Sequence, residues 1–164
     1  MFRVNDTVMY GSSGACKITG EVEKEYLGNI EKCFVLEPIF GNNLKIYVPL
    51  GNEHLVSKMH ALLSRGEVME IIKNLPEKGE EYIPNDNLRR QKYSEIISSG
   101  DRKRVGAVLK TLYDKKSEQL ENKKKLHQCD EFIMREAEKL IYDEFAIVLG
   151  VDHDKVHDYI ITNK

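Results

Sequence analysis

Two stretches of this sequence hold residue types whose spacing could do chemistry, and the first is a glycine pair near the N-terminus. In GSSGACKITG, Gly11 and Gly14 stand three residues apart and could cradle a phosphate if a helix followed. The residues after them alternate as in a strand instead. We therefore expect both glycines to be turn residues with positive φ and not a nucleotide-binding loop.

The second stretch contains His153 and His157, four residues apart. This spacing can place two imidazoles on one helix face toward a metal ion. The glutamate of an H-E-x-x-H motif is absent and aspartates surround the pair, so we expect a solvated polar turn and no cofactor. The chain also lacks a G-x-S-x-G element and a kinase signature set. We predict that it is not an enzyme.

Six basic residues open two predicted helices in the second half of the chain. They are Arg89, Arg90 and Lys92 in the first helix and Arg102, Lys103 and Arg104 in the second. Cations at a helix N-terminus oppose the helix dipole, and an anionic partner such as a phosphate backbone would offset this. In the alternative interpretation, Asp86 and Asp101 offset the dipole and the basic side chains keep the helices soluble. The sequence leaves both open.

Charge is unevenly distributed along the 164 residues, although the formal net charge is only -2. Residues 88–125 hold 12 Lys/Arg against 5 Asp/Glu, and residues 126–164 hold 4 against 9. The three cysteines form no C-x-x-C pair, so neither a disulfide framework nor a zinc ribbon is indicated. Without a long apolar run or an export signal, we expect a cytoplasmic protein that makes no membrane contact.

The spacing of apolar residues predicts an α+β protein of two domains. Residues 7–48 contain four or five short segments rich in β-branched and aromatic residues, which predict a small antiparallel barrel of the SH3 or Tudor kind. Ser64 and Glu67 form a capping box for a short helix that ends before Pro76. We expect a barrel domain over residues 1–75 and, because residues 76–87 are rich in proline, glycine and charge, a linker there.

Residues 88–164 predict a compact all-helical domain. Asn85 or Asp86 can cap its first helix, with Gly100 past the end, and Asp101 can cap the second. Apolar residues then recur every three or four positions over 127–149, and Asp152 can cap a last short helix. Four helices around a modest core are expected.

Four stretches carry a resemblance to a known family: FRVNDTVMYGSSGACKI, FVLEPIFGNNLKIYVP, the pattern LRRQKY…SGD…V..VL..LY, and AEKLIYDEFA. In this order and spacing they resemble the CarD/CdnL family of bacterial transcription regulators, whose N-terminal Tudor-like domain is shared with transcription–repair coupling factors. The resemblance covers nearly the whole chain.

The resemblance implies that the barrel binds the RNA polymerase β subunit, with the strand in LKIYVP pairing edge to edge with a polymerase strand. Tyr47 stands where relatives often have arginine, and this change leaves backbone pairing intact. The polymerase-binding residues implied in this way are Lys24, Lys45, Ile46, Tyr47, Val48 and Pro49.

The resemblance also implies that the helical domain contacts promoter DNA. Relatives carry a tryptophan wedge just before the Arg-Arg pair, where this chain has Asn87, and Leu88 or Tyr93 could replace the wedge. Glu131 and Phe132 stand in place of a basic pair. The DNA-binding residues implied here are Asn87, Leu88, Arg89, Arg90, Lys92, Arg102, Lys103 and Arg104.

The sequence therefore predicts a monomeric transcription regulator that polymerase recruits and that binds promoter DNA weakly, largely through phosphates. Its binding would modulate the stability of the open promoter complex. The alternative is a protein–protein adaptor that docks on polymerase without touching DNA. The salt dependence of DNA binding separates the two.

Overall fold

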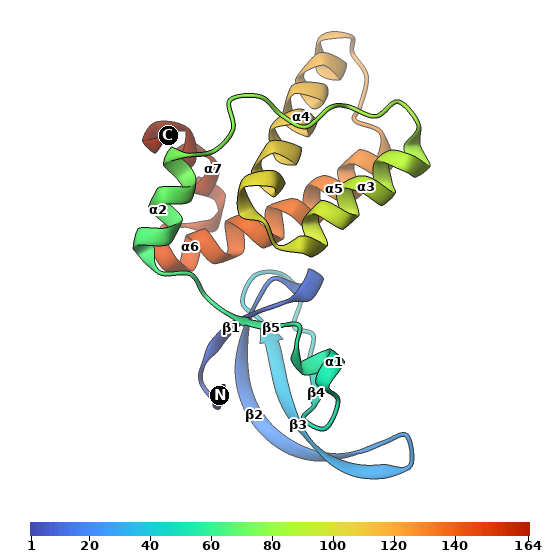
Figure 1. The fold of residues 1–164 in the computed structure, drawn as a ribbon, viewed down its shortest axis with the longest axis vertical. Helices are drawn as coiled ribbons and strands as arrows, with labels where there is room; N and C mark the ends of the chain where they lie inside the picture. The colour runs from blue at the N-terminus through green and yellow to red at the C-terminus, as the bar shows by residue number, and fades with distance from the viewer. The chain divides into compact units, whose positions relative to one another are not determined.

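The computed structural model describes residues 1–164, which divide into two compact units, Met1–Leu63 and Ser64–Lys164. The first unit is a five-stranded antiparallel sheet with the strand order β4-β3-β2-β1-β5 (Figure 1). Its strands are β1 (Thr7–Tyr10), β2 (Ala15–Tyr26), β3 (Asn29–Pro38), β4 (Ile46–Pro49) and β5 (Met59–Ala61). A helical turn, α1 (Glu53–Val56), precedes β5. The predicted small antiparallel barrel is confirmed.

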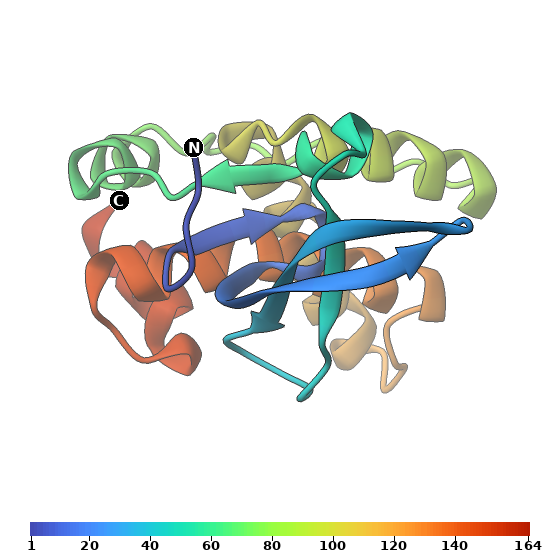
Figure 2. The same cartoon turned by 90° about the horizontal axis from the view of Figure 1, so that it is seen from below.

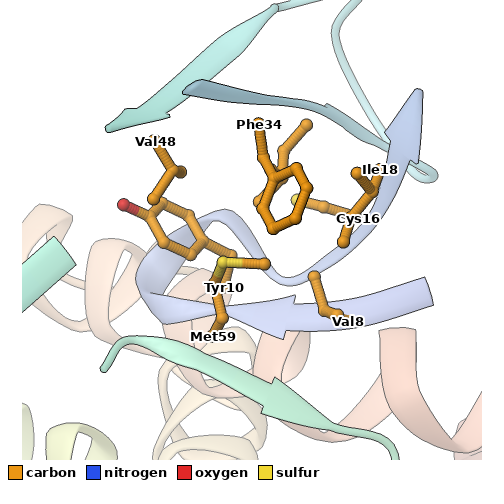
Figure 3. Packing of buried hydrophobic residues seen from close by; sticks show 8 residues of the cluster. Val8, Tyr10, Cys16, Ile18, Phe34, Val48 and Met59 are labelled. Carbon is orange, nitrogen blue, oxygen red and sulfur yellow. The ribbon is translucent and has the colours of Figure 1, made fainter. Parts of the chain in front are cut away.

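The sheet curls around its own core because alternate residues of each strand face inward. Figure 3 shows Tyr10, Phe34, Val48 and Met59 pointing toward one another between the strands. The sheet register shifts between Ile18 and Gly20 on β2, which marks a bulge. The buried cluster consists of Val8, Tyr10, Cys16, Ile18, Phe34, Leu36, Val48 and Met59.

The glycine pair near the N-terminus lies in the β1–β2 connection. Gly11 has φ 46° and Gly14 has φ 74°, which confirms the prediction of turn glycines with positive φ. A 3-10 turn, Gly11–Ser13, separates the two strands, and the chain continues into β2 and not into a helix. The phosphate-binding arrangement therefore lacks the helix N-terminus that it requires.

The second unit is helical throughout. Its α-helices are α2 (Arg65–Lys73), α3 (Asp86–Ser99), α4 (Arg102–Glu121), α5 (Gln128–Glu138), α6 (Glu144–Leu149) and α7 (Val156–Asn163). A π-helical turn, Lys139–Asp143, joins α5 to α6, and a 3-10 turn, His153–Lys155, leads into α7. None of the helices combines the length and the apolar composition that a membrane span requires.

The helix ends follow the local signals in the sequence. Ser64 and Glu67 form the predicted capping box, and the side chain of Asn85 accepts a hydrogen bond from Leu88 N–H at the start of α3. Asp101 caps α4. At the last helix the structure differs from the prediction, because Asp152 makes no side-chain cap and the chain first forms a 3-10 turn.

The observed division of the chain differs from the predicted domains. Helix α2 belongs to the second unit, where it contacts α6 and α7. Residues 76–87, predicted as a linker, lie along the helices of that unit. The Thr111 hydroxyl donates to Glu80 O at 2.7 Å, and the Tyr93 hydroxyl donates to Glu81 O at 2.7 Å. Side chains of α3 and α4 thus satisfy the carbonyls of a segment whose composition indicated a free connection.

Candidate functional site

The edge strand β4 is the first candidate site, because it pairs with β3 alone. Just past its end, Leu50 N–H donates to Lys32 O at 2.8 Å, so these opposed residues form a hydrogen-bonded pair. Such pairs alternate along an antiparallel ladder. Val48 therefore also bonds toward β3, while the N–H and C=O of Tyr47 point away from it. Tyr47 presents an open donor and acceptor at the sheet edge.

The side chains of Lys24 and Tyr47 come together at this edge. Lys24 Nζ lies 3.5 Å from the centroid of the Tyr47 ring and forms a cation–π contact, and the residue Tyr47 is 37% exposed. Lys45 forms an exposed ion pair of 3.7 Å with Glu37. The other predicted residues of β4 contribute backbone and not an exposed side chain, and they are the partly buried Ile46 and the buried Val48 and Pro49.

Arg89, predicted to contact DNA, is buried in the helical unit with 1% exposure. Its Nε donates to Asp130 Oδ1 at 2.6 Å and its Nη2 to Asp86 Oδ1 at 2.8 Å. Its Nη1 donates to Ile83 O at 2.7 Å. Each nitrogen of the guanidinium thus has an internal acceptor, and at 1% exposure Arg89 is not accessible to an external phosphate.

Tyr82 completes this group, which we call the Arg89 cluster (Tyr82, Asp86, Arg89 and Asp130). The Tyr82 hydroxyl donates to Asp130 Oδ2 at 2.9 Å, and Arg89 Cζ lies 4.6 Å from the Tyr82 ring centroid. Burial, together with the hydrogen bond to Asp130, raises the pKa of Tyr82 to about 12. The cluster fastens the segment before α3 and the first turn of α3 to α5.

Two of the three basic residues that open α4 also have internal partners. Arg102 Nη2 lies 2.9 Å from Glu144 Oε2, and Glu144 is fully buried. Arg104 Nε lies 3.2 Å from Glu80 Oε1. Lys103 is exposed and forms no ion pair. Asp101, Glu144 and Glu80 thus offset the unfavourable placement of basic residues at the N-terminus of α4. An external anion is not required for this.

The exposed predicted residues of α3 lie on different sides of the helix. Leu88 and Lys92 are four residues apart and share one face, with Leu88 44% exposed. Arg90 lies on the other flank, where its Cζ is 5.3 Å from the ring centroid of Phe132 on α5. Phe132 is 49% exposed. Sequence reasoning placed Phe132 at a lost basic position and missed its contact with Arg90, which arises because α3 and α5 pack together.

Asn87 is exposed in the first turn of α3, and the loop before α5 ends beside that turn. His127 Nε2 lies 3.4 Å from Asp86 Oδ2. The loop carries Lys123, Lys124 and Lys125, which are exposed and form no ion pair. The exposed basic side chains of the helical unit are therefore not confined to α3 and α4, because the α4–α5 loop adds three lysines without ion pairs.

The two histidines near the C-terminus bind separate partners. His153 Nε2 lies 2.7 Å from Asp143 Oδ1, and His157 Nδ1 lies 3.0 Å from the Tyr142 hydroxyl. No group of three His, Cys, Asp or Glu side chains in the chain is arranged to hold a metal ion. Both Asp143 and Tyr142 belong to the π-helical turn, so the histidines connect the last helical segment to that turn.

Comparison with known families agrees with this architecture. A family model described as the CarD-like/TRCF RID domain matches residues 2–60. A second, described as the CarD C-terminal domain, matches residues 67–161. Curated proteins gave no significant match. The two domains follow each other along nearly the whole chain, which confirms the resemblance, and the chain belongs to the CarD family of RNA polymerase-interacting transcription regulators.

Proposed function

We propose that this protein regulates transcription by binding the RNA polymerase β subunit through the β4 edge and promoter DNA through the helical unit. In this proposal a strand of the β subunit pairs with β4 and receives hydrogen bonds from the outward-facing backbone of Tyr47. Binding through both units shifts the balance between closed and open promoter. The protein performs no catalysis in this role and acts as a monomer in the cytoplasm.

The open edge at β4 is the observation that carries the proposal. A main-chain edge gives affinity without requiring a particular side chain, so the tyrosine at position 47 is compatible with docking. The Lys24–Tyr47 contact leaves part of the ring exposed beside the edge. Lys24 and Lys45 are exposed cations that can contact acidic residues of the partner.

Amide hydrogen exchange resolved by residue tests this pairing directly. In the free chain, the Tyr47 amide should exchange quickly because it has no acceptor, while the Val48 amide should be protected by β3. Addition of an isolated polymerase β fragment should slow exchange at Tyr47. Unchanged exchange at Tyr47 with saturating fragment would overturn docking through β4.

The helical unit is proposed to add a weak DNA contact once the barrel is docked. Arg90, Lys92 and Lys103 are exposed cations without ion pairs, and such groups bind phosphates and release counterions. Tethering to polymerase raises their effective concentration at the promoter, so a few contacts suffice. Asn87 stands where relatives have a tryptophan wedge and cannot fill an unstacked base step, so a weaker effect on the open complex follows unless the exposed Leu88 beside it serves as the wedge.

The burial of Arg89 favours a second candidate function, an adaptor that docks on polymerase without binding DNA. Arg89 and Arg102 are held by buried acidic partners, which removes two of the six cations from the predicted DNA surface. Arg104 pairs with Glu80 but remains 55% exposed. Affinity for DNA that falls steeply with salt supports the DNA-binding function. Absence of measurable DNA binding at low salt supports the adaptor.

A further inference from the structure

The β2–β3 hairpin extends beyond the rest of the barrel. β1 pairs only with residues 15–17 of β2, and β4 pairs only with residues 33–36 of β3. The ribbon therefore continues to its turn without a third strand, as Figures 1 and 2 show. A two-stranded ribbon buries little of its own surface.

The turn at the end of this ribbon exposes apolar side chains and places a leucine in the left-handed backbone region. Leu27 has φ 51° and Gly28 has φ 82°, which is the backbone of a type I′ turn, where Asn-Gly is preferred. A leucine in the left-handed region is strained, and Leu27 is 88% exposed, so no packing within the chain offsets that strain. Ile30, on the strand just after the turn, is 77% exposed. We call Tyr26, Leu27 and Ile30 the hairpin tip.

Acidic side chains flank the hairpin tip. Glu25 lies opposite Ile30 in the sheet register, and Glu23 lies one step further from the turn on the same face. Both are exposed, and neither forms an ion pair. On this face Lys32 pairs with Glu21 at 3.5 Å, whereas Lys24 lies on the opposite face, over Tyr47. The surface that fits this tip is an apolar pocket with lysine or arginine at its rim.

We propose that the hairpin tip is a second docking point for the polymerase β subunit, received by such a pocket beside the strand that pairs with β4. This inference rests on the proposed function. The Lys24–Tyr47 contact joins the ribbon to the β4 edge on the face that carries Tyr26. Ile30 lies on the opposite face, so the pocket encloses the tip from both sides. A partner seated on β4 therefore lies along the ribbon that carries the tip.

Substitutions in the turn separate binding from folding. Leu27→Asn creates the preferred Asn-Gly turn, so it should maintain or raise the melting temperature. Ile30→Thr keeps a β-branched residue in the strand. Each should weaken binding of the full-length chain to an isolated polymerase β fragment about tenfold, because each removes a buried apolar contact. Leu120→Asn and Ile161→Thr make the same changes at exposed helical residues and should leave affinity unchanged.

Charge gives a second readout of the same surface. The double variant Glu23→Gln and Glu25→Gln should weaken binding at low salt and flatten its dependence on salt. If this double variant binds the fragment as tightly as the wild type does, the proposal that lysine or arginine lines the rim of the pocket is wrong.

The outcomes distinguish this inference from the proposed function. If the fragment protects Tyr47 from exchange but binds the Leu27→Asn and Ile30→Thr variants as tightly as the wild type, the tip is no docking point and β4 docking stands. If the fragment binds neither wild type nor variants, both proposals fail. Self-association of the wild type that Leu27→Asn abolishes would show that a second copy occupies the tip, and would overturn this inference.

Discussion

Arg89 Nε and Asp130 Oδ1 lie 2.6 Å apart in the helical unit, and both side chains are only 1% exposed. A buried charge is tolerated when an opposite charge and further acceptors surround it, as Asp86 and the carbonyl of Ile83 do here. Arg89 thus fastens α3 to α5, while Arg90, the next residue, remains exposed. One basic pair in the sequence therefore divides into a structural residue and a surface residue.

Arg89→Met should lower the free energy of unfolding of the helical unit by about 3–5 kcal/mol, because it leaves Asp130 buried without its partner. Denaturant titration followed by circular dichroism measures this change. Arg90→Met is the matched control on the exposed side of α3, and its effect should stay within about 0.5 kcal/mol. Equal stability of the two variants would contradict a role of the Arg89 cluster in holding the helices together.

Lys92→Gln and Lys103→Gln should each reduce the slope of log affinity for duplex DNA against log salt by about 0.9, because each removes one phosphate contact. Titrations at several salt concentrations give the slopes. Lys45→Gln on the barrel serves as the control and should leave the slope unchanged. Slopes that all equal that of the wild type would show that these lysines do not contact phosphates.

Gly79→Ala should destabilise the helical unit, because a Cβ at this position would lie 2.9 Å from Thr111 N and 3.1 Å from Ala107 O. The absence of a Cβ lets the chain at Gly79 approach α4, where Glu80 exchanges hydrogen bonds with Thr111 and Ala107. Gly66→Ala is the matched control in α2, where a Cβ meets only the Ser64 hydroxyl at 4.0 Å, and it should stabilise by up to about 1 kcal/mol. A neutral Gly79→Ala would indicate that this segment is a free linker after all.

Much of the fold could be predicted because its signals are local. Asn85, Asp101 and Gly100 mark helix ends, and alternation marks the strands. The short elements β5 and α1 carry too few residues for a period to be seen. The packing of residues 76–87 could not be predicted, because the carbonyls of that segment are satisfied by side chains far along the chain, such as Thr111.

The candidate site could be predicted only in part. Tyr47 and Lys24 were inferred from a resemblance, and the structure adds their contact and the outward backbone of Tyr47. The sequence does not show which basic residues are buried. The partner that buries Arg89, Asp130, lies 41 positions away, so no local pattern indicates the pair. The hairpin tip was not predicted, since Leu27 and Ile30 read as ordinary strand and turn residues until their exposure is known.

Stability should fall as the pH rises above about 10, because burial raises the pKa of Tyr93 and Tyr142 to about 12. Burial and the Asp130 hydrogen bond raise the pKa of Tyr82 equally far. Between about pH 10 and pH 12, the folded state keeps protons that the unfolded state has lost, so unfolding releases protons and higher pH favours it. Below pH 10 this contribution is fully present.

Tyrosinate absorbance and circular dichroism, recorded together during alkaline titration, test this prediction. Ionisation of these three tyrosines should coincide with loss of helix signal. Tyr93→Phe removes one buried hydroxyl and should reduce the loss of stability with pH. Full tyrosine ionisation while the helices remain intact would contradict the buried environment of these side chains.

The affinity of the chain for an isolated polymerase β fragment, compared between Tyr47→Pro and Tyr47→Val, tests the central claim most directly. Both variants remove the ring and its contact with Lys24, but only proline removes the outward N–H. Val48→Pro would be a poorer choice, because the Val48 N–H faces β3. The account predicts that Tyr47→Val binds within a few-fold of the wild type and that Tyr47→Pro binds at least about tenfold more weakly than Tyr47→Val. Equal affinity of the two variants would contradict docking by strand pairing at β4.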